Sequence, residues 1–76
     1  MTASVPQART VAVEFCRRVR ERRLLVRLTQ QQLADNAQVK VAFIGRIERG
    51  IANPSLVTMA LIAQALGCSL TELIPQ

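Results

Sequence analysis

The stretch from Leu28 to Leu56 reads LTQQQLADNAQVKVAFIGRIERGIANPSL and carries the clearest structural pattern in the chain. Thr29 is followed three residues later by Gln32, a capping-box signature in which the two residues satisfy otherwise unpaired backbone donors at a helix start. A helix is therefore predicted to begin at Gln30. Its apolar residues recur at helical spacing and form a narrow stripe of Leu33, Ala34 and Ala37.

A second helical pattern follows a short break at Gln38 and Val39. Gly50 stands where such a helix would end in a left-handed residue. The apolar positions of this second helix are Phe43, Ile44 and Ile47. Two helices of about two turns each, joined by about three residues, indicate a helix-turn-helix over residues 29–50, a motif whose second helix enters the major groove of DNA.

Several short motifs in and after this stretch match one known family. They are Leu28-Thr29-Gln30, Leu33-Ala34, Ile44, Arg46-Ile47-Glu48-Arg49-Gly50, Asn53-Pro54-Ser55-Leu56 and Ala65-Leu66-Gly67. Together they resemble the Cro and lambdoid-repressor type of helix-turn-helix domain, also called the xenobiotic-response-element type, over about residues 15–74. The resemblance implies an all-α, compact five-helix domain like that of lambda repressor, with the helix-turn-helix at helices two and three. In length and layout the chain is also similar to the small controller proteins of restriction-modification systems and to Cro-like repressors.

The size of the chain and its charge distribution fit one small DNA-binding domain. Seventy-six residues bury only about 60 to 65% of their unfolded surface, so dimerisation is expected to add to the core. All ten Lys and Arg residues lie at or before Arg49, whereas residues 50–76 contain a single charged residue, Glu72. The first two thirds therefore suits a polyanion and the last third suits a protein surface. Residues 1–10 are interpreted as an arm or the start of the first helix, and residues 11–76 as the single domain.

Composition argues against several other classes of protein. No apolar run approaches the roughly 20 residues of a membrane span, and the N-terminus lacks an export signal, so a cytoplasmic, nucleoid-associated protein without membrane contact is expected. Cys16 and Cys68 fit no metal-ligand spacing and the chain has no His, so no metal or cofactor is predicted. The two cysteines are interpreted as small hydrophobic residues, with a redox switch as the alternative. No nucleophile-base pair, Gly-rich phosphate loop or carboxylate cluster suggests an enzyme.

Three further helices are predicted outside the helix-turn-helix. The first runs from Val11 to Val26, with Ser4 or Thr10 as alternative caps. Another spans residues 56–66 between the cap Ser55 and a terminating Gly67, and a last short helix covers residues 70–74 after a second capping box. The core-facing stripe of the fourth helix is predicted to be Leu56, Met59, Ile62, Ala63 and Leu66, and that of the first helix includes Phe15, Val19 and Val26.

Two charged residues are predicted to face inward. Arg23 falls on the inner face of the first helix and Glu48 on the inner face of the second helix of the motif, so each needs a partner. The resemblance implies that they form a structural salt bridge between these helices.

The resemblance also assigns roles in DNA binding by position on the motif. Gln30, at the first turn of its helix, is expected to contact a phosphate, as are Arg49 and Asn53 beyond the second helix. The base-reading face is expected to consist of Lys40, Val41, Ala42, Gly45 and Arg46. Arg46 is the strongest candidate, because a guanidinium can bind guanine O6 and N7 together.

The chain departs from the family pattern at three positions. Gln38 and Arg27 stand where turn glycines are usual, and Lys40 stands where a Ser or Thr cap is usual. A left-handed conformation at Gln38 or Arg27 is expected to cost about 1 kcal/mol relative to glycine.

Apolar residues left outside the core suggest a protein interface. Val57 and Leu61 lie four residues apart on the outer side of their helix, and Ile74 extends the same patch. We expect a homodimer that regulates transcription from a roughly palindromic operator, with recognition helices about 34 Å apart. The alternative is an antitoxin that uses this patch to bind a toxin and also represses its own operon. RNA polymerase remains open as a further partner.

Overall fold

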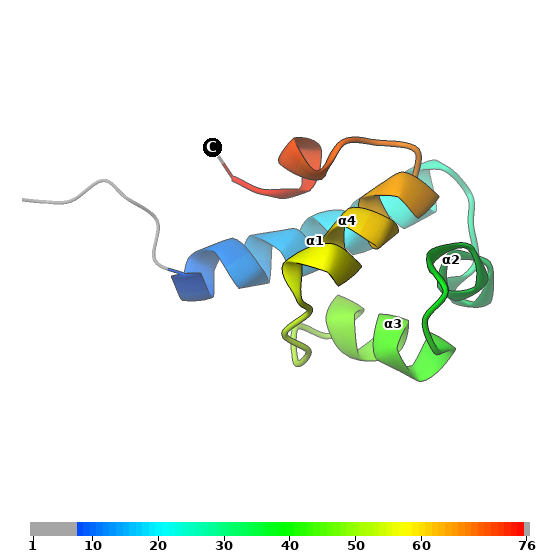
Figure 1. Ribbon diagram of the computed structural model, residues 1–76, viewed down its shortest axis with the longest axis horizontal. Coiled ribbons are helices and arrows are strands. Elements are labelled where there is room, and N and C mark those ends of the chain that lie inside the picture. The colour runs from blue at the N-terminus through cyan, green and yellow to red at the C-terminus, as the bar shows by residue number, and fades with distance from the viewer. Residues whose placement is uncertain (1–7, 76) are drawn as a thin grey trace, which may run out of the picture.

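The computed structural model describes residues 8–75, which form a small all-helical fold without strands in that range (Figure 1). Its elements are α1 (Ala8–Leu25), α2 (Gln30–Ala37), α3 (Val41–Glu48), α4 (Leu56–Ala65) and the 3-10 helix η1 (Leu70–Leu73). In the view of Figure 1, α3 lies below α1 and α4, whereas η1 lies above them. The helix-turn-helix expected over residues 29–50 is therefore α2 and α3.

The predicted count of five α-helices is wrong, because the last element is a 3-10 helix of four residues. The expected capping box of Ser69 and Glu72 is present, and the Glu72 amide donates to the Ser69 carbonyl at 3.1 Å. Ile74 already has extended backbone angles, since a residue that precedes a proline is pushed out of the α region. Only one tight turn therefore fits between Ser69 and Pro75.

The first helix begins at Ala8 and ends at Leu25, so it starts earlier than the predicted Val11. Residues 8–10 belong to this helix rather than to an arm. Thr10 lies inside the helix and does not cap it, and Ser4 lies outside the described residues. Val26 follows the helix end and is exposed, which corrects its predicted place in the core.

A single hydrophobic core joins α1, α2, α3, α4 and η1. The assignment of Leu56 to this core is wrong: 66% of its surface is exposed. Leu56 is the first residue of α4, and the buried residues of α4 come later, so the first turn of the helix projects beyond the core. The large side chains that are fully buried are Phe15, Val19, Leu33, Ile44, Ile47, Ile62 and Leu73.

Each α-helix is followed by a residue in the left-handed conformation. Gly50 and Gly67 have φ angles of 77° and 73°, as their positions predicted. Arg27 and Gln38 adopt the same conformation, with φ angles of 62° and 61°. Each of the four turns contains the paired backbone hydrogen bonds of a Schellman motif, such as Val39 N to Ala34 O at 3.0 Å. The turns thus keep their hydrogen bonds although glycine is absent from two of them.

Replacing Gln38 by glycine is expected to raise the free energy of unfolding by about 1 kcal/mol, because glycine adopts the left-handed conformation without strain. Denaturant unfolding measures this change. Gln31→Gly, the same substitution within helix α2, is the matched control and should lower the free energy of unfolding by about 0.5 to 1 kcal/mol. Equal destabilisation by the two substitutions would show that the turn at Gln38 is not strained.

Candidate nucleic-acid interface

Helix α3 is fixed to the fold by one face and exposes the other. Ile44 and Ile47 are buried, and α3 packs against both α2 and α1. Lys40 caps the helix with its backbone alone, since its carbonyl accepts from Phe43 N at 3.0 Å and no side-chain cap bond forms. The exposed side chains on the opposite face are those of Lys40, Val41, Ala42, Arg46 and Arg49. This face combines three cations with two small apolar side chains.

Gly45 differs from the other predicted base-reading residues because it is buried. A Cβ atom at this position would lie 3.4 Å from Arg49 Nη1, so the guanidinium of Arg49 lies over the helix at Gly45. Arg49 therefore folds back along α3 instead of extending past its end. The backbone of Gly45 is covered by that side chain, and Arg49 occupies the surface that Gly45 was predicted to present.

The predicted salt bridge between Arg23 and Glu48 is present and is bidentate. Arg23 Nε donates to Glu48 Oε2 at 2.6 Å and Arg23 Nη2 donates to Glu48 Oε1 at 2.9 Å. The two side chains are only 12% and 4% exposed, respectively. Arg23 Nη1 also donates to the carbonyl of Leu28 at 2.9 Å. The pair therefore ties α1 to the end of α3 and to the loop that leads into α2.

Gln30 joins the same network, which the sequence analysis did not anticipate. Its Nε2 donates to Glu48 Oε1 at 3.1 Å. Burial alone would raise the pKa of Glu48, but the hydrogen bonds from Arg23 and Gln30 outweigh it and hold that pKa below its ordinary value. A carboxylate at the end of α3 thus fixes the side chain at the start of α2.

Arg20 is a further cation at this junction that the sequence analysis did not assign. Its Nε lies 4.0 Å from Glu48 Oε1, and its side chain is 58% exposed. Arg20 stands three residues before Arg23, so helical spacing alone would have placed the two side chains on neighbouring positions of one face. Asn53, the remaining predicted phosphate contact, is exposed in the loop between α3 and α4.

The predicted dimer residues differ in exposure. Val57 is 70% exposed, whereas Leu61 is half-buried. Ile74 is half-buried and packs against the core, and its carbonyl accepts from Arg18 Nη1 at 3.2 Å. The exposed apolar surface of α4 therefore centres on Leu56 and Val57.

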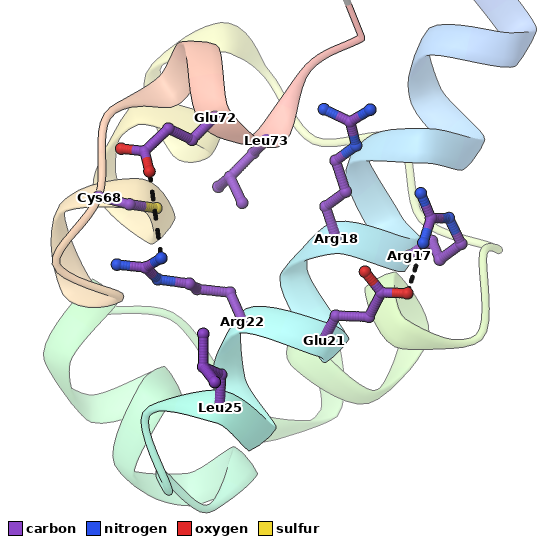
Figure 2. Close-up of a pocket in the computed structure, with 8 residues that line it drawn as sticks. All are labelled: Arg17, Arg18, Glu21, Arg22, Leu25, Cys68, Glu72 and Leu73. Carbon is purple, nitrogen blue, oxygen red and sulfur yellow. Dashed lines mark hydrogen bonds and ion pairs between the residues drawn. The ribbon is translucent and has the colours of Figure 1, made fainter.

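A separate cleft lies between α1 and η1, as Figure 2 shows. Four of its five charged residues form opposite pairs, since Arg17 bonds Glu21 and Arg22 lies 4.0 Å from Glu72, whereas Arg18 pairs with Glu14. Because these charges largely compensate one another, the cleft is a poorer match for a polyanion than the exposed face of α3.

The two cysteines lack the surroundings of a reactive site. Cys16 is buried and Cys68 is half-buried, and both are free thiols. Burial raises the pKa of each thiol, which favours the protonated form. Among residues 8–75, no three His, Cys, Asp or Glu side chains gather in a way that could hold a metal ion. In the same range, no helix combines the length and apolarity required to cross a membrane.

The fold, with α2 and α3 joined by a short turn and one face of α3 exposed, is that of a helix-turn-helix domain. Residues 19–73 match the protein family described as helix-turn-helix, and the chain belongs to that family. The chain is 34% identical over 62 residues to the HTH-type transcriptional regulator DdrOP3 of Deinococcus deserti. The matched region covers 82% of this chain and 48% of that protein. It is also 40% identical over 48 residues to the immunity repressor protein of Bacillus phage phi105, and this match covers 63% of this chain and 33% of that protein.

A solved structure shares both the fold and much of the sequence. The restriction-modification controller protein C.AhdI from Aeromonas hydrophila superposes with a TM-score of 0.79 and 36% identity, over 83% of this chain and 96% of that chain. The resemblance predicted from the motifs is thereby confirmed, since a phage repressor and a restriction-modification controller are both among the similar proteins. The chain spans about half the length of DdrOP3 and a third of the phage repressor.

Proposed function

We propose that this protein is a sequence-specific transcriptional regulator that binds double-stranded DNA. The observation that carries the proposal is the exposed face of α3, where Lys40, Arg46 and Arg49 flank two small apolar side chains. The similar proteins support it, because DdrOP3 is named as a transcriptional regulator, the phage protein as a repressor and C.AhdI as a controller. The proposed activity is binding without catalysis or cofactor, and it requires access to the nucleoid in the cytoplasm.

In the proposed complex, α3 enters the major groove with its N-terminal end leading. Arg46 binds a guanine through two hydrogen bonds, while Val41 and Ala42 press on thymine methyl groups. Lys40 contacts a base or a phosphate. The backbone contacts come from Gln30 at the start of α2, from Arg49 and from Asn53. Few side chains on this face offer hydrogen bonds to bases, so DNA shape contributes to the selection of the site.

We further propose that the protein acts as a homodimer on a roughly palindromic operator. The exposed surface around Val57, extended by Leu61 and Ile74, is apolar in a segment that has almost no charge. To read two half-sites one turn of DNA apart, the recognition helices of such a two-fold dimer must lie about 34 Å apart. Occupancy of the operator would then depend on protein concentration through the dimer equilibrium. Restriction-modification controllers and Cro-like repressors are the kinds of regulator that this arrangement fits.

Val57→Asp tests the dimer. An aspartate in the centre of an apolar interface is expected to weaken self-association at least tenfold, because its charge would be buried without a partner. Sedimentation equilibrium measures the change. Val13→Asp, at another exposed valine on α1, is the matched control and should leave self-association unchanged. If both variants and the unaltered chain are monomers at the same concentrations, the homodimer proposal is wrong.

The exposed apolar surface also favours a second candidate, an antitoxin that covers this surface with a toxin. In that case, the isolated chain would be monomeric and a second small protein would co-purify with it through the Val57 surface. RNA polymerase, the other protein partner considered, would instead bind only when the regulator occupies a promoter.

A further inference from the structure

Three donors converge on one carboxylate oxygen at the junction of α1, α2 and α3. Glu48 Oε1 accepts from Arg23 Nη2 at 2.9 Å and from Gln30 Nε2 at 3.1 Å, and Arg20 Nε lies 4.0 Å away. Gln30 and Arg20 therefore both reach this one carboxylate oxygen, from α2 and from α1 respectively. A phosphate group accepts hydrogen bonds at about 2.7 to 2.9 Å through several oxygens, so it can accept from two side chains at once.

The charges of this junction leave one cation in excess. Arg23 and Glu48 neutralise each other through two hydrogen bonds and are almost fully buried. Arg20 is largely exposed, and within the part of the chain that the structure describes it makes no hydrogen bond of its own. Its guanidinium therefore keeps its donors for another acceptor.

Gln30 also retains donor capacity. A side-chain amide carries two N–H donors, and only one of them is needed for the bond to Glu48. That bond restrains the amide and leaves its second N–H available to another acceptor. The amide lies at the N-terminus of α2, where the partial positive charge of the helix also favours an anion.

We propose that Arg20 and Gln30 form a clamp for a single phosphate of the DNA backbone, with Glu48 as the positioning residue that aligns both side chains. The inference rests on the proposed DNA binding and adds a contact from α1, which lies outside the helix-turn-helix. Glu48 is the last residue of α3. The clamp therefore links the anchoring phosphate directly to the helix that reads the bases.

The first test compares Arg20→Ala with Arg17→Ala on a duplex of arbitrary sequence. Both substitutions remove one cation from α1, but Arg17 lines the cleft between α1 and η1, where it pairs with Glu21 (Figure 2). Arg17 also pairs with Glu14. Arg20→Ala is expected to lower affinity roughly tenfold. The negative slope of log K against log salt should become shallower by about 0.9 per protomer, because one phosphate contact is lost. Arg17→Ala should leave the slope unchanged. Equal losses and equal slopes for the two variants would overturn the clamp.

The second test measures whether the members of the clamp act together. In the double variant Arg20→Ala with Gln30→Ala, the loss of affinity should be smaller than the product of the two single losses. Glu48→Gln should weaken binding when Arg20 and Gln30 are both present and have little further effect in the background of the double variant Arg20→Ala with Gln30→Ala. A purely structural role of Glu48 would instead lower affinity equally in both backgrounds and would overturn its positioning role.

These outcomes are separable from failure of the proposed function. If the unaltered chain binds no duplex even at low salt, DNA binding itself is wrong. If it binds DNA and the Arg20 and Gln30 effects are independent, only the clamp is wrong. The Arg20 and Gln30 substitutions are at positions outside the core, so this comparison stands even if Glu48→Gln fails to fold.

Discussion

Replacing Glu48 by alanine is expected to lower the free energy of unfolding by about 3 to 5 kcal/mol, because it leaves Arg23 buried without its counter-charge. Arg23 is tied to Glu48 by two hydrogen bonds, and Gln30 would lose its acceptor as well. Chemical denaturation followed by circular dichroism measures the loss. Glu21→Ala is the matched control: Glu21 pairs with Arg17 on the exposed surface, where an ion pair contributes little to stability. A loss below about 1 kcal/mol in Glu48→Ala would contradict the structural role of the pair.

The same pair should make stability depend on pH. The pKa of Glu48 is lower in the folded protein than in the unfolded chain, so its contribution to stability is fully present above the ordinary pKa of 4.5 and is lost as the pH falls through the folded-state pKa. The unaltered protein should therefore lose stability in acid more steeply than Glu48→Gln does. The pKa values of Glu14 and Glu72 are also lowered, so these residues add to the acid sensitivity of both proteins. The difference between the two proteins therefore isolates the contribution of Glu48.

Replacing Arg46 by alanine is expected to remove the preference for one base pair in each half-site. The binding free energy that separates the preferred base pair from the others at this position, about 1 to 3 kcal/mol, should disappear. Arg46 is exposed on α3, and its side chain lies outside the core, so the fold should be unaffected. Affinities for the preferred duplex and for duplexes with that base pair changed would be compared by fluorescence anisotropy. The variant should bind all of them alike.

Gln30→Ala provides the contrast to Arg46→Ala. A phosphate contact carries no direct sequence information, so its loss should lower affinity for every duplex by the same factor and preserve the order of preference. If Arg46→Ala also lowered all affinities uniformly, Arg46 would be a backbone contact and the assigned reading face would be wrong.

Local rules predicted much of this fold because the signals lie within a few residues of each other. The capping box of Thr29 and Gln32 starts α2 as expected, and Ser55 caps α4. Gly50 and Gly67 end their helices in the predicted conformation. The Arg23 and Glu48 pair was also predictable, since the resemblance supplied a partner for two charges that helical periodicity turned inward.

The errors arose where three-dimensional packing decides the result. Periodicity assigned Leu56 to the core because it continues the stripe of α4, but the first turn of the helix extends beyond its neighbours. The last element was predicted as an α-helix over residues 70–74 but is a 3-10 helix, because Pro75 forces Ile74 into an extended conformation and leaves room for only one turn. The contact of Gln30 and Arg20 with Glu48 depends on how three helices meet, which no local pattern encodes.

The most direct test of the central claim is selection of bound duplexes from a random DNA pool at about physiological salt, where nonspecific attraction to basic residues is weak and base contacts persist. The account predicts recovery of a roughly symmetric site with half-sites one helical turn apart. Recovery of no preferred sequence from folded protein would contradict it, and the exposed surface around Val57 would then be better explained as the binding site of a protein partner.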